Sequence, residues 1–390
     1  MGKRPFPSSL SSLSKEELIK LVLKYEPHRA DDSFQASKKS NIFEAEAYPS
    51  QMVALKVSYF GAKYQGFASQ VGLKNFCSPE TNPSTAANTV EDHIFRAMLH
   101  TRLILNPETC QYSRCGRTDA GVSSTGQVIA LRLRSSARKD SEEAVNYAKI
   151  LNKQLPEDIR ILDWAFVNDS FSARFSCSAR LYHYYFSKKH FDPATNTIFD
   201  LDIELMRRAA SQLVGTHDFR NFCRKDPSKP NQSFTRAVLE AFIEPVDGEG
   251  TFYRFVCKGT AFLYHQVRCM MSVLFMVGSE REPVELIEAL LTKVNAEIPG
   301  PRVHYELASE TPLVLYECFY EKEGDERINW ASNSEDFRND TCFNYNSNHF
   351  AHLWELKQAE TYIYRGLVDT SKAASYSGTT GSLYKKLIND

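Results

Sequence analysis

The sequence predicts an α+β fold with a largely antiparallel mixed sheet, built in two similar halves and flanked by helices. Three observations lead to this prediction. Strand-like and helix-like segments alternate irregularly, and several strands follow one another at hairpin spacing. The order of segments in the first half of the chain roughly repeats in the second. The 390 residues, of which 42% are hydrophobic and 24% charged, suffice for two or three folding units.

The first half is expected to contain strands and helices with clear periodicity. Alternating or β-branched segments predict strands over 53–60, 127–134 and 158–167. A helix is expected over 89–100, where apolar residues recur at helical spacing. A second helix is expected near 141–154, and Pro156 stops it.

The second half is also expected to contain both strands and helices. Its expected strands are 179–186, 235–244, 252–258 and 312–320. A helix over 202–215 has Asp202 as its N-cap and Gly215 as its stop. A strongly apolar helix is expected over 261–278.

Both ends of the chain are expected to be appendages. Near the N-terminus, a helix over 14–27 is followed by a polar linker over 29–41. The polar, Asn-rich tail has one helical stretch near 351–366. The expected organisation is therefore an N-terminal helical and linker extension, a first half, a second half and a C-terminal extension, over 1–50, 51–167, 168–322 and 323–390.

Composition argues against several protein classes. The formal net charge is −1, so any nucleic-acid binding must come from local clusters of basic residues. Nine cysteines are scattered without paired spacing, which is typical of a reduced intracellular protein. No apolar segment follows Lys3 and Arg4, and no run is long enough for a membrane span. We expect a protein of the nucleus and cytoplasm without a secretory signal.

The common cofactor motifs are absent from the sequence. There is no GxGxxG, no Walker loop and no GxSxG, and the run GVSSTG has the wrong spacing for the last. Cys110 and Cys115 have no matching second pair, which a zinc site would need. Cys342, His349 and His352 could ligate a metal in principle, but a coincidence in the weakly patterned tail is favoured. We expect neither a metal nor an organic cofactor.

The stretch RCGRTDAGV contains one carboxylate, Asp119, between two glycines. Gly116 and Gly121 permit positive φ and close backbone approach, which suits a turn that presents one side chain into a cleft. Arg117 could keep the carboxylate ionised, as a nucleophile requires. A surface turn in which Asp119 acts as a local cap explains the same residues equally well.

The apolar segment 261–278 is interrupted by few polar residues, among them His265 and Arg268, which are three apart and so share a face of a helix. A buried arginine requires an anion, and Asp119 is a candidate. The alternative is that Arg268 reaches solvent along its stem, but its apolar flanks favour burial. A histidine such as His265 is more often structural than catalytic.

Aromatic and basic residues suggest contact with RNA. Tyr182 and Tyr184 share one face of their strand, where they can stack on unpaired bases or simply fill the core. Two basic clusters suggest phosphate contacts, although a solvated surface also explains them. They comprise Arg132, Arg134 and Arg138, and then Arg220, Arg224, Lys225 and Lys229.

The run CGRTDAGVSSTGQVIAL resembles the catalytic motif of tRNA pseudouridine synthases of the TruA family. Further segments resemble blocks of that family in the family's order, and together they cover about residues 52–320: VSYFGAKYQGF, NTVEDHIFRAML, FSARFSCSARLYHYYF, GTHDFRNFCR and AFLYHQVRCMM. The forms HDFRNFC and HQVRCMM are most similar to the eukaryotic branch that modifies tRNA positions 38 and 39. Ala120 and Phe67 depart from residues common among relatives, lysine and tryptophan respectively.

The resemblance implies the pseudouridine synthase fold with a central RNA-binding cleft, and a homodimer acting on tRNA without a cofactor. It makes Asp119 the nucleophile and Arg117 the residue that helps extrude the uridine. Tyr182 then stacks on the flipped base, Arg268 pairs with the catalytic carboxylate, and Leu315 or its neighbour Leu313 lines the pocket. We further expect substrate contacts from one histidine and several arginines, His265, Arg132, Arg134, Arg180 and Arg220.

The implied reaction breaks the N1–C1′ bond of uridine, turns the base and joins C5 to C1′. It is an isomerisation, so it needs no redox partner. Two alternatives stay open at this point. A nucleosidase-like hydrolase would also use Asp119, but that class usually needs a second carboxylate. A non-catalytic protein that binds structured RNA would not be expected to retain Asp119.

Overall fold

The computed structural model describes most of the chain, over residues 48–70, 88–136, 145–192, 197–226, 229, 232–292, 305–321, 328–334 and 341–375. The chain separates into two compact units, 1–44 and 45–390, and all described residues belong to the second. The helix and linker expected near the N-terminus lie outside the described residues.

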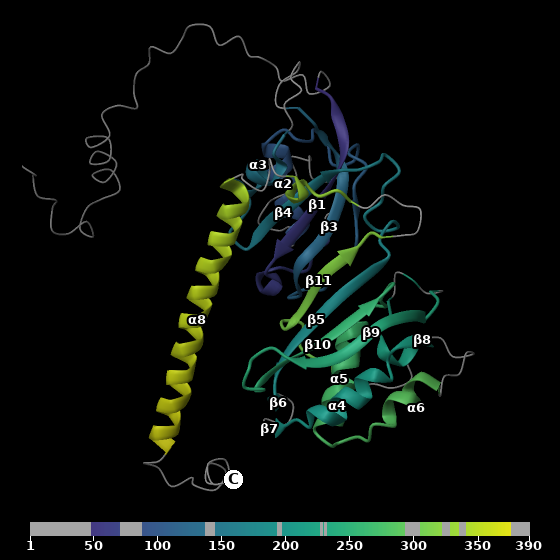
Figure 1. The fold of residues 1–390 in the computed structure, drawn as a ribbon, viewed down its shortest axis with the longest axis vertical. Coiled ribbons are helices and arrows are strands. Elements are labelled where there is room, and N and C mark those ends of the chain that lie inside the picture. The colour runs from purple at the N-terminus through teal and green to yellow at the C-terminus, as the bar shows by residue number, and fades with distance from the viewer. Residues whose placement is uncertain are drawn as a thin grey trace, which may run out of the picture. The chain divides into compact units, whose positions relative to one another are not determined.

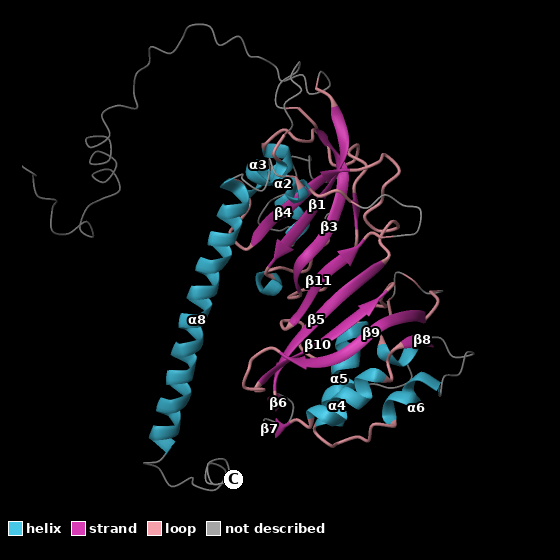
Figure 2. Cartoon of the chain, in the orientation of Figure 1, coloured by secondary structure: helices cyan, strands magenta, loops and turns pink. Residues whose placement is uncertain are grey.

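One nine-stranded sheet forms the centre of the described unit (Figures 1 and 2). Its strands are β1 Ser50–Tyr59, β2 Ser113–Arg114, β3 Ser123–Arg134, β4 Ile159–Phe166, β5 Ala179–Ser187, β8 Gly215–Asp218, β9 Thr235–Pro245, β10 Phe252–Gly259 and β11 Leu313–Phe319. The order is β4-β1-β3-β11-β5-β10-β9-β8, with β2 paired to β3. β3 and β11 pair in parallel, and the other described pairings are antiparallel. The predicted α+β fold with a largely antiparallel sheet is confirmed.

Helices pack beside both parts of this sheet (Figure 2). They are α2 Val90–His100, α3 Tyr147–Asn152, α4 Ile203–Ser211, α5 Gln266–Gly278, α6 Leu286–Thr292 and α8 Thr341–Ser375. The side chain of Asp202 accepts from the backbone N–H of Leu205, which confirms the predicted cap of α4. Among the described helices, none is both long and apolar enough to cross a membrane.

The helix boundaries differ from the predictions where tertiary contacts decide them. α3 is shorter than the helix expected near 141–154, of which residues 141–144 lie outside the description. α5 begins at Gln266, five residues later than predicted, because His265 adopts a left-handed conformation with φ 61°. A small separate sheet pairs β6 Lys189–Asp192 with β7 Thr197–Asp200, and the sequence analysis missed it.

The two sets of helices cover opposite faces of the sheet. Side chains alternate between faces along a strand. In β1, Val53 and Leu55 join the hydrophobic core that α2 and α3 cover, whereas Ala54 joins the core on the other face. Tyr182 of β5 lies on the same face as Ala54. It packs against the core that contains Ala54 and also against the core beneath α4 and α5.

The β3–β11 contact joins the first half of the sheet to the second. The hydroxyl groups of Ser124 and Thr125 donate to the carbonyls of Leu315 and Tyr316, over 2.7 and 2.8 Å. Gly126 lies directly against β11, so that a Cβ atom there would be only 2.4 Å from the carbonyl oxygen of Tyr316. This junction therefore tolerates no side chain at residue 126.

We predict that Gly126→Ala lowers the free energy of unfolding by about 1–3 kcal/mol, because the added methyl group forces β3 and β11 apart. Chemical denaturation measures this change. Gly248→Ala is the matched control, since a Cβ there has no heavy atom within 4 Å, and its effect should stay within about 0.5 kcal/mol. Equal stability of the two variants would show that the junction yields without cost.

Candidate active site

Asp119 lies in the loop between β2 and β3, and hydrogen bonds hold this loop on both sides of it. The backbone N–H of Phe67 donates to the carbonyl of Thr118 over 3.2 Å. The N–H of Gly121 donates to the carbonyl of Tyr64, also over 3.2 Å. The loop is thereby attached to the segment that follows β1, and Asp119 has a defined position.

The two glycines of the loop differ in their structural roles. Gly121 has φ 80°, which confirms the predicted need for glycine there. A Cβ on Gly121 would also be 2.5 Å from Cγ of Glu310. Both the backbone conformation and the lack of space therefore disfavour any other residue at this position. Gly116 does not have a positive φ, and a Cβ there would meet nothing within 4 Å. The conformational argument for Gly116 was therefore wrong.

The carboxylate of Asp119 is largely buried, with 24% of its side chain exposed. Its Oδ2 lies 3.4 Å from Nε2 of His265. Burial raises the pKa of Asp119 to about 6, against the lowering influence of Arg268, and Glu310 raises it further. Near neutral pH the carboxylate is mostly ionised, yet it can take up a proton under mildly acidic conditions.

His265 occupies the N-cap of α5 rather than the helix itself, so the expected shared helical face with Arg268 was wrong. Burial lowers the pKa of His265 to about 4, and the nearby Arg268 and Arg224 lower it as well. The imidazole is therefore neutral at physiological pH. Its contact with Asp119 does not supply a counter-charge.

Arg268 projects from the first turn of α5, and 12% of its side chain is exposed, which confirms the predicted burial. Its Nε donates to the carbonyl of Ala308 over 2.8 Å, and its Nη2 donates to Oε2 of Glu310 over 2.9 Å. The described ion pair of Arg268 is thus with Glu310, and the expected direct pair with Asp119 stays a prediction. The positive charge still reaches Asp119 through space and lowers its pKa.

Glu310 is the residue of this site that the sequence analysis missed. It lies in the segment just before β11, outside every motif that was singled out. A single glutamate in a loop carries no sequence signal. It becomes visible only through its contact with Arg268 and Gly121.

Arg117 is exposed, and among the described residues it forms no ion pair with Asp119. Burial and the charges of Arg268 and Glu310 account for the pKa of Asp119 instead. The hypothesis that Arg117 holds the carboxylate ionised was therefore wrong. Its exposed side chain leaves it accessible to a bound substrate.

The predicted pocket residues lie on neighbouring strands. Tyr182 of β5 is opposite Leu315 of β11, and Leu313 is opposite Tyr184. The ring of Tyr182 is half-buried and meets the ring of Phe262 edge to face, with centroids 5.0 Å apart. Leu315 is fully buried in the core against which Tyr182 packs, so it supports the tyrosine from inside the protein.

Arg180 holds the protein's own backbone. Its guanidinium donates to the carbonyls of Thr260, Arg174 and Cys115 over 2.6, 3.0 and 3.3 Å. Cys115 begins the loop of Asp119, and Thr260 precedes the segment that leads to α5. In this geometry Arg180 ties these loops together, and its expected contact with the substrate stays a prediction.

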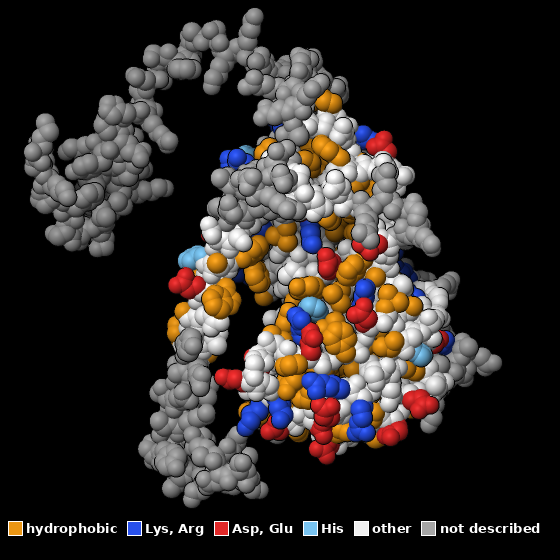
Figure 3. Space-filling model, viewed as in Figure 1, with side chains coloured by type: hydrophobic (Ala, Val, Ile, Leu, Met, Phe, Trp, Pro, Cys, Tyr) orange, Lys and Arg blue, Asp and Glu red, His pale blue; other side chains and the backbone are white. Residues whose placement is uncertain are grey.

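The other basic candidates also have protein partners. Arg132 pairs with Asp169 over 2.7 Å, and Arg220 pairs with Asp218 over 2.7 Å. Arg134 lies over the ring of Tyr48, 5.3 Å from its centroid. Figure 3 shows positive and negative side chains interspersed on the visible face of the second half of the sheet. Their contact with RNA stays a prediction.

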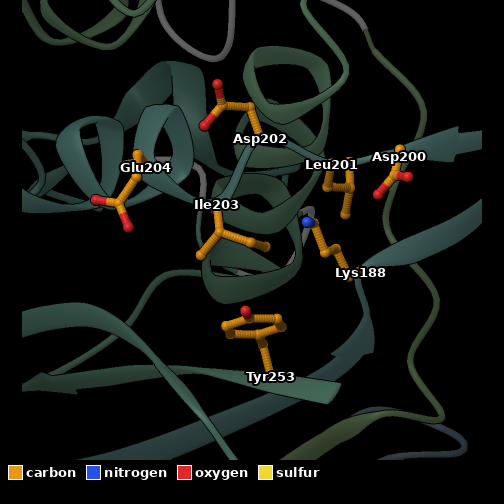
Figure 4. Close-up of a pocket in the computed structure, with 7 residues that line it drawn as sticks. All are labelled: Lys188, Asp200, Leu201, Asp202, Ile203, Glu204 and Tyr253. Atoms are coloured by element: carbon orange, nitrogen blue, oxygen red, sulfur yellow. The ribbon is translucent and has the colours of Figure 1, made fainter. Parts of the chain in front are cut away.

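A separate pocket of about 430 Å³ is lined by Lys188, Tyr253 and residues 200–204 (Figure 4). None of the predicted site residues lines it. The carboxylate of Asp202, one of its acidic groups, caps α4. Within the described part of the chain, no group of three or more His, Cys, Asp or Glu side chains is placed to hold a metal ion.

The raised pKa of Asp119 predicts a pH-dependent stability. Asp119 binds its proton more tightly in the folded protein than in the unfolded chain. In the unfolded chain the pKa of this carboxyl group has its ordinary value of 3.8. This contribution to stability is present below about pH 4 and is lost as the pH rises through about 6. Asp119→Asn should therefore be more stable than the wild type at pH 8, by up to about 3 kcal/mol.

Chemical denaturation at pH 4 and pH 8 measures this difference. The gain of Asp119→Asn should shrink towards pH 4, where the wild-type carboxyl is itself protonated. Asp200→Asn, which changes an exposed carboxylate on β7, controls for the loss of a surface charge. A gain that does not depend on pH would contradict the burial of an ionised Asp119.

Comparison with known proteins identifies relatives over most of the chain. A family model described as tRNA pseudouridine synthase matches residues 209–321. The human tRNA pseudouridine(38/39) synthase is 40% identical over an alignment of 356 positions, which covers 85% of this chain and 66% of the human protein. The chain thus spans just under two thirds of the length of that relative.

Two further relatives are matched over more of their length. The tRNA pseudouridine(38/39) synthase of Saccharomyces cerevisiae is 35% identical, over 88% of this chain and 73% of the yeast protein. The tRNA pseudouridine synthase A of Streptococcus pneumoniae is 31% identical, over 68% of this chain and 97% of the bacterial protein. With its sheet, its Asp119 loop and these relatives, the chain belongs to the tRNA pseudouridine synthase family.

Proposed function

We propose that this protein isomerises uridine to pseudouridine in tRNA, at positions 38 and 39 of the anticodon stem-loop, with Asp119 as the nucleophile. The observation that carries the proposal is the largely buried carboxylate of Asp119, held by its loop beside Arg268 and His265. Family membership, together with relatives named for positions 38 and 39, supports the choice of substrate.

The arrangement suits chemistry on an extruded base. The target uridine leaves its stack at a cost of a few kcal/mol, which stacking on Tyr182 and contacts in the pocket offset. Leu315, which is opposite Tyr182 and fully buried, supports that residue from the core. The exposed Arg117 lies two residues from Asp119, where it can take the place of the extruded base in the RNA.

Asp119 then assists cleavage of the N1–C1′ bond in its ionised form. The base turns and C5 forms the new bond to C1′. The hydrogen of C5 then leaves as a proton, and N1, freed from C1′, takes up a proton. No electron donor or acceptor is consumed, because substrate and product are isomers. Since the reaction needs ionised Asp119, its rate should rise with pH through the pKa of about 6.

The nucleosidase alternative receives little support from the site. Such an enzyme would use a second carboxyl group as a proton donor to the leaving base. Glu310 is the nearby acidic residue, but its Oε2 accepts a hydrogen bond from Arg268. The hydrogen bond holds this carboxyl group against Arg268 rather than against a leaving base.

The proposal includes an assembly and a location. We expect a homodimer that binds tRNA in a central cleft and acts in the nucleus and cytoplasm. The resemblance to the family motivates the homodimer, and the nine cysteines, scattered without paired spacing, motivate the location inside the cell. Size-exclusion chromatography with light scattering tests the first, and imaging of the tagged protein in cells tests the second.

The reaction is tested with unmodified tRNA that carries tritium at uridine C5, incubated with purified protein and no cofactor. Tritium release is expected, because the C5–C1′ bond can form only when this hydrogen leaves. Asp119→Ala should abolish release while tRNA affinity stays within about threefold, since the carboxylate serves turnover rather than binding. Substrates with uridine only at position 38 or only at position 39 then map the target.

Release of free uracil would instead identify a nucleosidase. Tight tRNA binding without tritium release by the wild type would identify a non-catalytic RNA-binding protein. Near-normal turnover of Asp119→Ala would rule out Asp119 as the nucleophile.

We also predict that Arg117→Ala reduces single-turnover tritium release more than about tenfold, a loss of at least about 1.4 kcal/mol of transition-state stabilisation. Its melting temperature should not change, because the side chain is exposed. Arg208→Ala removes a comparably exposed arginine on α4 and serves as the control. Equal rates for both variants would exclude a role of Arg117 in extruding the base.

A further inference from the structure

The turn that leads into α5 has two aromatic rings at its centre. The backbone N–H of Gln266 donates to the carbonyl of Leu263 over 3.1 Å, and the N–H of Leu263 donates to Oε1 of Gln266 over 2.7 Å. These reciprocal hydrogen bonds close a four-residue turn whose central residues are Tyr264 and His265. The N–H of Arg224 donates to the carbonyl of Tyr264 over 3.0 Å, so the turn is also attached to a second segment.

The conformation of this turn brings the two rings together. In an extended chain, successive side chains point in opposite directions. His265 instead has φ 61°, at the third position of the turn, where glycine is usual for a positive φ. Its ring stacks on the ring of Tyr264, with centroids 3.7 Å apart and planes 28° apart. A histidine in the left-handed region is strained, and strain of this kind is concentrated at functional sites.

The two-ring stack has one end at Asp119 and the other end open. Nε2 of His265 lies 3.4 Å from Oδ2 of Asp119, and 14% of the His265 side chain is exposed. Tyr264 is 42% exposed. Because one side of its ring lies against His265, the exposed area belongs to the other side and the edge. Burial raises the pKa of Tyr264, and the charge of Asp119 raises it further, so the phenol is neutral at physiological pH.

An accessible, neutral aromatic ring beside a site that acts on RNA suits a nucleobase as its ligand. RNA loops expose unstacked bases, which proteins bind on aromatic side chains. Such a stack accepts any base, because every base has a π-face. Tyr182, assigned above to the extruded uridine, is half-buried against the ring of Phe262. The ring of Tyr264 is a separate surface, available to a second base.

We propose that Tyr264 stacks on the unpaired loop base next to the target uridine and so holds the anticodon loop beside Asp119 while the uridine enters the pocket. This inference rests on the proposed function and adds a second base-binding residue to it. Binding then depends on the presence of a base beside the target as well as on the target itself. A ring that served only as packing for His265 would not sense that base.

The test compares the affinities of two tRNAs that differ at the loop nucleotide on the 5′ side of the target uridine. One tRNA has its natural base there, and the other is abasic. The full-length Asp119→Asn variant is used, so that binding is measured without turnover. Loss of the base should weaken binding about tenfold, which is the contribution of one stacked base. When Tyr264→Leu is added, the two tRNAs should bind within about twofold of each other.

Two further variants in the same background serve as controls. Tyr264→Phe keeps the ring and should keep the preference for the natural tRNA. Tyr316→Leu is the matched control, since Tyr316 is 39% exposed and also stacks on a histidine, His183, with centroids 4.0 Å apart. His183 lies on the face of β5 opposite to Tyr182, so this control should keep the preference as well. An equal preference in Tyr264→Leu and Tyr316→Leu would overturn the proposal and leave Tyr264 a packing role only.

A second measurement reports stacking even if Tyr264→Leu does not fold. The base analogue 2-aminopurine, placed at the same loop nucleotide, fluoresces weakly when stacked and strongly when unstacked. Its emission should be weak in the complex with Asp119→Asn, become strong when Tyr264→Leu is added, and stay weak with Tyr316→Leu. Strong emission in the presence of Tyr264, or equally weak emission in its absence, would overturn the proposal. Absence of tritium release by the wild type would overturn the proposed function instead, so the two failures can be told apart.

Discussion

The parallel pairing of β3 with β11 is the constraint on which the active site depends. Val314 and Leu315 are opposite Ser123 and Ser124, so the two strands start at the same end of the sheet. The residues that immediately precede parallel partners must then lie close together. The segment before β3 contains Asp119, and the segment before β11 contains Glu310. One backbone pairing therefore brings the two carboxylates into the same site.

The second consequence of this pairing concerns α5. The segment before β11 supplies both acceptors of Arg268, the carbonyl of Ala308 and the carboxylate of Glu310. A buried arginine is stable only when its donors are satisfied. The site thus combines one positive charge and two carboxylates, of which Glu310 is the more exposed, with 40% of its side chain accessible. Asp119 is the more buried of the two carboxylates. Because burial makes its ionisation less favourable, its pKa is raised.

The basic residues illustrate how a charged side chain in a sequence can have either of two roles. Arg180 resembles a phosphate ligand by type, but its guanidinium binds the backbone carbonyls of three loops. A guanidinium has five donors in a rigid fork, which suits it to joining several carbonyls as well as to binding phosphate. Arg117 differs because it is exposed. Only the set of acceptors around each arginine separates these roles.

Local physical chemistry made much of the fold predictable from the sequence. The helix cap at Asp202 and the positive φ of Gly121 depend on contacts within a few residues. The alternation of apolar and polar residues along the strands is likewise a local property. The loop of Asp119 was singled out by its glycines and its carboxylate, and the resemblance to a family gave Asp119 its proposed role. The left-handed His265 and the true start of α5 were not predicted, because residues 261–266 contain no glycine, proline or common N-capping residue that would mark the turn.

The sequence by itself determined the elements, the likeness to a family and the position of the carboxylate. Only the tertiary structure decided which partner Arg268 takes and which residues share the site with Asp119. Ser124 and Leu315, whose hydrogen bond helps to join the two strands, are 191 residues apart in the chain. Contacts over such separations depend on how the strands pair, and they leave no periodic or local signal in the sequence. For this reason the sequence alone could not identify Glu310 as a residue of the site.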